Sequence, residues 1–107
     1  MGGTPLVQGT LDLLILRALK NEELHGLAIA RRVEHLSGNA FSVKAGSLFP
    51  ALQRMSDAGW LLSSWGLLEG RRVKSYRLSA AGRRQLKAEA DKWRRVAGAM
   101  SIALQGI

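Results

Sequence analysis

Basic and hydrogen-bonding side chains gather in two short stretches of the sequence. The first begins with Lys44 and Ser47, and the second holds Arg71, Arg72 and Lys74. Such groups suit phosphate oxygens and base edges. Residues 61–107 carry ten basic and three acidic side chains, whereas residues 1–60 carry six and five. This concentrated positive charge predicts a polyanionic partner and favours nucleic acid over ribosomes, acidic proteins or membranes.

Residues that would support catalysis or metal binding do not occur in suitable arrangements. The chain has no cysteine, and neither His25 nor His35 has a suitably placed carboxylate for a zinc site. The serines lack a nearby His–Asp pair, and no glycine-rich phosphate loop follows a strand. We therefore expect no enzyme, no cofactor and no metal, and we interpret His25 as a surface or helix-cap residue.

Helices and a hairpin must position the basic side chains. Apolar residues recur at helical spacing from Leu11 to Leu19, and Leu48, Leu52 and Met55 form the inner face of a third helix. Pro50 places the start of that helix at about 46–47, because the first turn tolerates a missing N–H. The predicted elements are helices at 11–20, 24–37 and 46–58, strands at 60–67 and 72–78 joined by a turn at 69–71, and a last helix capped by Ser79.

This order predicts a mainly α fold with a small antiparallel β-hairpin. Helix, strand, charged turn and strand are the parts of a winged helix-turn-helix, in which the second helix presents its N-terminal residues to the major groove. We expect residues 1–79 to form this unit and residues 80–107 to form a long C-terminal dimerisation helix, the two making one compact body.

The last predicted helix carries a heptad pattern. Apolar residues follow a 4-3-4-3 spacing at Leu86, Ala90, Trp93, Ala97, Met100, Leu104 and Ile107. A helix of about 35–40 Å at 1.5 Å per residue is too long for so small a domain to bury. We expect a homodimer in which Leu13 and Leu16, off the apolar face of the first helix, join the interface. The alternative is a last helix folded back on the first.

A second set of residues follows from the helix–wing arrangement. Small residues at the start of the third helix allow close approach to DNA, and the basic tip of the hairpin would straddle the backbone or a minor groove. The alternative for each residue alone is a solvated side chain. The candidate contacts with double-stranded DNA are His25, Lys44, Ser47, Phe49, Pro50, Gln53, Arg54, Arg71, Arg72 and Lys74.

Membrane segments and export signals are not evident in the sequence. It has no apolar run of about 18 residues, and its N-terminus lacks a basic region followed by an apolar one. These features, with the lack of cysteine, predict a cytoplasmic protein without a membrane partner.

The segment from Gly46 to Trp60, GSLFPALQRMSDAGW, resembles the recognition helix of PadR-like transcriptional regulators, which read G-[ST]-L-Y-P-A-L-x-R-L-x-x-x-G. The stretches Leu24–Gly26, Trp65-Gly66 and 71–82 are similar as well, so the likeness covers roughly residues 8–95. It implies a homodimeric winged-helix repressor of the smaller subfamily, which has a single C-terminal helix. Members usually bind inverted-repeat operators, and small aromatic or drug-like compounds relieve repression in some of them.

The sequence departs from the family pattern at a few positions. Phe49 replaces the usual tyrosine and lacks its hydroxyl, Met55 replaces leucine, and Ser75 replaces a common aromatic. Trp93 falls where some relatives place an aromatic at an effector site, although a packing role in the dimer seam is favoured. A winged-helix interaction module without DNA binding is the alternative function. The operator, the regulated genes and the effector do not follow from the sequence.

Overall fold

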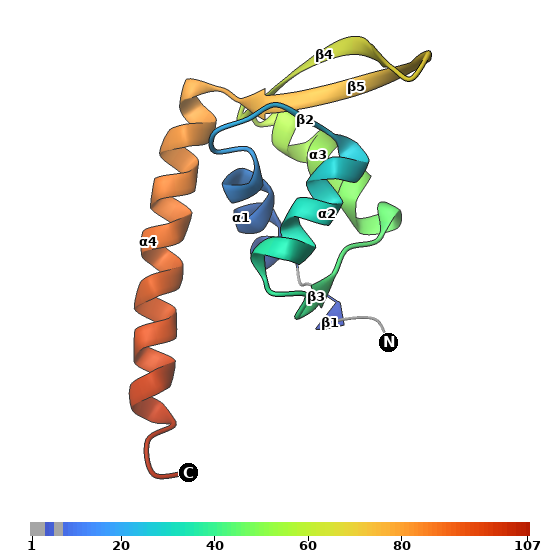
Figure 1. The fold of residues 1–107 in the computed structure, drawn as a ribbon. Coiled ribbons are helices and arrows are strands. Elements are labelled where there is room, and N and C mark those ends of the chain that lie inside the picture. The colour runs from blue at the N-terminus through green and yellow to red at the C-terminus, as the bar shows by residue number, and fades with distance from the viewer. Residues whose placement is uncertain (1–3, 6–7) are drawn as a thin grey trace.

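The computed structural model describes residues 4–5 and 8–107 of the chain (Figure 1). Helices α1, α2 and α3 group together, the β4–β5 hairpin lies across one end of them, and the long helix α4 runs along the side of α1. The predicted mainly α fold with a small antiparallel sheet is therefore confirmed. The elements are β1 Thr4–Pro5, α1 Gln8–Ala18, β2 Leu24–His25, α2 Gly26–Leu36, β3 Phe41–Ser42, α3 Ala45–Asp57, β4 Leu61–Leu68, β5 Arg71–Leu78 and α4 Ala80–Ala103.

The core lies where the first three helices meet. Leu48, Leu52 and Met55 are buried, which confirms the predicted inner face of α3. The expectation that Leu16 lies at a dimer interface is wrong, because this residue is fully buried within one chain. The reason is that α1 packs against α2, α3 and α4, so apolar residues on more than one of its sides are covered within one chain.

Helix α3 begins earlier than Pro50 suggested. Its N-cap is Lys44, so Pro50 lies inside the helix and not in its first turn. Because proline has no N–H, the carbonyl of Gly46 loses its intrahelical donor. Gly46 is exposed, so water can satisfy that carbonyl.

The segment before α2 is a short strand. Leu24 pairs with Tyr76 and His25 pairs with Ser75, which adds β2 to the hairpin and gives the sheet order β2-β5-β4. His25 has extended backbone angles, so α2 starts at Gly26. A separate pair of short parallel strands joins β1 to β3.

The hairpin is a regular antiparallel ladder from the Leu61–Leu78 pair to the Leu68–Arg71 pair. Only its base is anchored, because Leu61, Tyr76 and Leu78 are buried and the remaining residues of β4 are exposed. Glu69 and Gly70 form the turn with φ values of +53° and +77°. Two central residues with positive φ are typical of a tight type I′ turn, so the tip is narrow.

Helix α4 starts as the sequence predicted. The Ser79 Oγ accepts a hydrogen bond of 3.0 Å from the N–H of Gly82, which confirms the N-cap. At 24 residues the helix is about 36 Å long. It ends at Ala103, so Leu104 is only the C-cap and Ile107 lies beyond the helix. The division at residues 79 and 80 stays a prediction, and residues 1–3 and 6–7 of the first unit lie outside the described part.

Candidate nucleic-acid interface

The N-terminal half of α3 presents one face to the core and the other to solvent. Leu48, Ala51 and Leu52 are buried, whereas the five predicted contacts on the other face are exposed. The Gln53 Nε2 donates a hydrogen bond of 2.9 Å to the Asp57 Oδ1, one turn further along the helix. The amide oxygen of Gln53 stays available to a donor on DNA. The exposed contacts are Lys44, Ser47, Phe49, Pro50 and Gln53.

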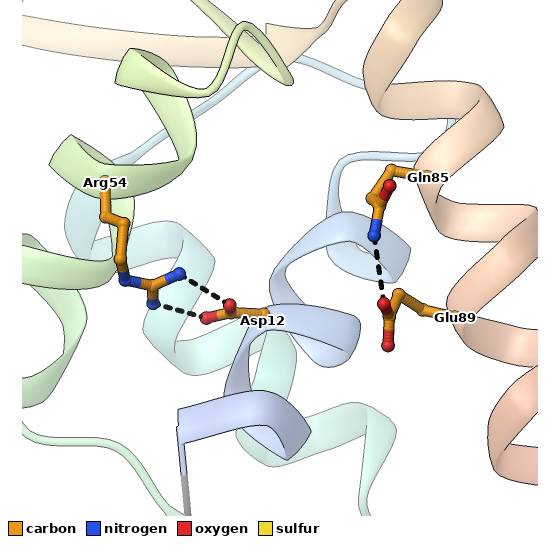
Figure 2. A network of polar contacts seen from close by, with 4 residues as sticks. All are labelled: Asp12, Arg54, Gln85 and Glu89. Carbon is orange, nitrogen blue, oxygen red and sulfur yellow. Dashed lines mark hydrogen bonds and ion pairs between the residues drawn. The ribbon is translucent and has the colours of Figure 1, made fainter.

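Arg54 differs from the other predicted contacts on α3. Its Nη1 and Nη2 donate hydrogen bonds of 2.7 and 2.8 Å to the two carboxylate oxygens of Asp12 on α1 (Figure 2). The hydrogen bonds to Asp12 raise the pKa of the Arg54 guanidinium above its ordinary value. Because this bidentate pair occupies two of its N–H groups, the structure gives Arg54 a role between α1 and α3.

His25 caps helix α2. Its Nδ1 accepts a hydrogen bond of 3.3 Å from the N–H of Ala28, which confirms the interpretation as a cap residue. The next residue, Gly26, packs against the ring of Phe49, where an added Cβ would lie 2.6 Å from the Phe49 Cε1 atom. This close approach joins the start of α2 to the exposed face of α3.

A groove of about 530 Å³ lies between the hairpin and the starts of α2 and α3. His25, Phe49, Arg71 and Lys74, four of the predicted DNA contacts, line it together with Trp65. These side chains come from β2, α3, β4 and β5. Lys44, Ser47, Pro50, Gln53, Arg54 and Arg72 are not among its lining residues.

Trp65 is a feature of the site that sequence reasoning missed. The residue is 58% exposed, the Arg72 guanidinium carbon lies 4.5 Å from the centroid of its ring, and the Lys74 Nζ lies 5.9 Å from that centroid. Such cation–π contacts order long cationic side chains and leave their N–H groups able to donate. The signal was the register, because a turn at Glu69–Gly70 places Trp65 opposite Lys74.

Apart from the buried Leu16, the predicted dimer residues of α1 and α4 divide into two groups. Leu13, Leu86, Ala90 and Ala97 are half-buried, and Leu86 packs against the core. Trp93, Met100 and Leu104 are 51%, 57% and 59% exposed. The first turns of α4 therefore fold back on α1, as the alternative interpretation expected, whereas residues 4–5 and 8–107 leave an apolar face of its second half exposed.

Trp93, the candidate effector contact, lies at the border between these groups. Together with Leu13, Phe41, Leu86 and Ala90 it lines a mostly apolar cavity of about 270 Å³ between α1 and α4. Arg17 and Arg94 are also part of the lining. A cavity of about 150 Å³ is enough for benzene, so this one has room for a small aromatic molecule.

The described part of the chain has neither a metal-binding cluster nor a helix suited to span a membrane. Within residues 4–5 and 8–107, no group of three or more His, Asp or Glu side chains could hold a metal ion. Among the helices of the same part of the chain, none is both long and apolar enough to cross a membrane.

Comparison with known proteins gives a consistent family. The sequence matches the transcriptional regulator PadR-like family over residues 15–88. Transcriptional regulator Rv3488 of Mycobacterium tuberculosis is 35% identical over 72 residues, 67% of this chain and 64% of that protein. A PadR family transcription regulator from Clostridium difficile has 27% identity and a TM-score of 0.77, covering 88% of this chain and 97% of that one.

A more distant structure shows the same fold. A transcriptional regulator from Clostridium thermocellum has 21% identity and a TM-score of 0.83, and the match covers 92% of this chain and 96% of that chain. The family consists of transcription regulators and not of enzymes. Since the family match spans more than half of the sequence, the chain belongs to the PadR-like family and is a DNA-binding transcriptional regulator.

Proposed function

We propose that the chain is a repressor that binds an inverted-repeat operator in double-stranded DNA as a homodimer. The observation that carries the proposal is the groove between hairpin, α2 and α3, which gathers His25, Phe49, Arg71 and Lys74 from separate parts of the sequence. The tip of the hairpin and the start of α3 both lie on the side of the molecule away from α4 (Figure 1). DNA bound on that side would leave α4 free to pack against a second copy of the chain.

In this proposal, α3 enters the major groove and the hairpin contacts the backbone. Lys44 and Ser47 lie at the exposed start of α3, where the N–H groups of the first turn also favour phosphate. Gln53 lies further along and would read a base edge through its amide. Arg71 and Arg72 would neutralise phosphates and fix the register.

The proposed homodimer uses the uncovered apolar face of α4. Trp93, Met100 and Leu104 would pack against the same residues of a second copy, which accounts for their exposure in one chain. A two-fold dimer presents two recognition helices, so the half-sites of the operator would lie about one helical turn, or roughly 34 Å, apart. An operator-binding protein acts where the chromosome lies, which for a bacterial-type regulator is the cytoplasm.

A small aromatic effector is the second part of the proposal. The cavity beside Trp93 lies between α1, which contacts α3, and α4, which carries the dimer face. A planar ligand stacked on Trp93 would separate these helices and so weaken operator binding. The competing role for Trp93 is packing in the dimer seam. Candidate compounds should quench tryptophan fluorescence and release bound DNA, and a Trp93→Phe variant that responds fully would contradict an effector role for Trp93.

DNA binding is tested by gel shift with a fragment from immediately upstream of the protein's own gene. The wild type should shift the fragment, with an affinity that falls steeply as salt rises. Arg71→Ala with Arg72→Ala should weaken binding and flatten the salt slope by about two phosphate contacts. The control, Arg84→Ala with Arg95→Ala, removes the same charge from exposed positions on α4 and should keep the slope. No shift at low salt from an intact dimer would favour a protein-interaction module.

A further inference from the structure

Two exposed leucines at the tip of the hairpin are not explained by backbone contacts alone. Leu67 is 78% exposed and Leu68 is 44% exposed, and both lie beyond the anchored base of the ladder. The turned end of the hairpin projects clear of the three helices (Figure 1). Exposed leucines next to a tight turn are an aggregation hazard unless a partner covers them.

The register places a cation beside each leucine. Leu67 lies opposite Arg72, and Leu68 lies opposite Arg71. Neighbouring pairs of an antiparallel ladder point to opposite faces, so each face of the tip carries one leucine and one arginine. A ribbon lying flat on DNA would need its arginines on one face only. Arginines on both faces match the two phosphate walls of a groove.

We propose that Leu67 and Leu68 form an apolar wedge, which presses between the sugar walls or base steps when the hairpin tip meets the DNA minor groove edge-on. This inference rests on the proposed DNA-binding function and adds an apolar contact at the hairpin tip to the proposed contacts of Arg71 and Arg72 with the backbone. The minor groove is about 6 Å wide, so only the turn and its adjacent pair can enter. The tight turn at Glu69 and Gly70 keeps that end narrow.

The charges around the tip support DNA as the occupant. Arg71, Arg72 and Lys74 outnumber the single carboxylate of Glu69. The Arg72 guanidinium carbon lies 4.5 Å from the centroid of the Trp65 ring, and a cation–π contact leaves the guanidinium N–H groups able to bind phosphate. Glu69 opposes the phosphates, so its neutralisation should strengthen binding. Apolar wedges from other proteins unstack base steps and bend the duplex, which gives the proposal a measurable signature.

The chain offers a matched control for the wedge. Leu62 and Leu68 are both 44% exposed, lie in β4, point to the same face and each sit opposite an arginine. They differ in their distance from the turn, because six residues of strand separate them by about 20 Å, and Leu68 alone of the two lines the groove beside Phe49. A wedge at the tip requires Leu68 and not Leu62.

The test uses a short duplex that the full-length wild-type protein selects from random-sequence DNA, with dyes at both ends to report bending. Leu67→Ala with Leu68→Ala should weaken binding by on the order of tenfold and reduce the bend, with the salt slope unchanged. Leu62→Ala should stay within about twofold of the wild type. Glu69→Gln should bind more tightly. Replacing G·C by inosine·C pairs under the tip removes the minor-groove amino group and should alter wild-type affinity more than that of the double-leucine variant.

Three results would overturn the inference. In the first, the double-leucine variant binds and bends DNA like the wild type, while Arg71→Ala with Arg72→Ala weakens binding. The wing would then lie along the backbone. Loss of self-association in the double-leucine variant would mean that the leucines cover a protein surface. Failure of the wild type to select any duplex would overturn the proposed function together with the wedge, whereas the first two results leave DNA binding in place.

Discussion

Arg54 of α3 and Asp12 of α1 are joined by two hydrogen bonds of 2.7 and 2.8 Å (Figure 2). The Asp12 side chain is only 14% exposed, so its carboxylate depends on this partner more than a surface group would. Helix α1 also packs against α4, so the pair connects α3, the helix proposed to read DNA, to the helix that carries the proposed dimer face. In the proposed function, Arg54 would therefore act on DNA through the position of α3.

The first prediction concerns this pair. Arg54→Ala should lower the free energy of unfolding by about 1–2 kcal/mol, because it leaves a mostly buried carboxylate without its bidentate partner. Arg31→Ala removes the same charge from an exposed position on α2 and should change stability by less than about 0.5 kcal/mol. Urea unfolding measures both. If Arg54→Ala keeps wild-type stability but flattens the salt dependence of DNA affinity, Arg54 contacts DNA directly and does not mainly hold α3 in place.

The second prediction compares two glycines of α4. Gly82 is buried, and an added Cβ would overlap the backbone carbonyl oxygen of Trp60, which the side chain cannot avoid by rotation. Gly82→Ala should destabilise the fold by about 1–3 kcal/mol. Gly98 has nothing within 4 Å of the same added atom, so Gly98→Ala should stabilise the helix by about 0.5–1 kcal/mol. If the Tm shifts in the same direction for both variants, this account of the packing at Gly82 and Gly98 is wrong.

The third prediction concerns Tyr76, the only tyrosine of the chain. Burial raises the pKa of its phenol above the ordinary value of about 10. As pH rises past 10, the unfolded chain releases this proton before the folded chain does, so stability should fall with further rise in pH. Phenolate absorbance reports a single group here and should titrate above pH 10. In Tyr76→Phe, the free energy of unfolding should fall less steeply above pH 10. If it falls as steeply as in the wild type, other groups cause the loss of stability.

Much of the fold was predictable because the deciding interactions are local. The spacing of Leu48, Leu52 and Met55 predicted the inner face of α3, and Ser79, as an N-cap residue, predicted the start of α4. The order of helix, strand, turn and strand located the wing. Each of these signals acts within a few residues of sequence, where periodicity and capping chemistry decide the outcome.

The remaining features depend on distant contacts or on competing local signals. Arg54 meets Asp12 across 42 residues of sequence, and nothing near Arg54 indicates that partner. Leu16 is buried because α1 has neighbours on several sides, which a single amphipathic stripe does not reveal. The heptad pattern suggested a helix as far as Ile107, but the chain leaves the helix after Ala103 and Gly106 has a φ of +86°. Glycine at that position was a stop signal that the apolar spacing concealed.

The last prediction tests the proposed dimer through the second half of α4. Met100 is 57% exposed on the seam, whereas Ala99 is exposed about a third of a turn away from it. Met100→Glu should dissociate the dimer, because it places a charge without a partner in an apolar interface. Ala99→Glu adds the same charge outside the seam and should leave the dimer intact. Sedimentation gives the mass of each variant. Operator affinity should fall only for Met100→Glu, because a monomer binds one half-site and loses the added affinity of the second. If both variants remain dimeric, the seam is not the contact between copies, and the exposed apolar residues of α4 require a different partner.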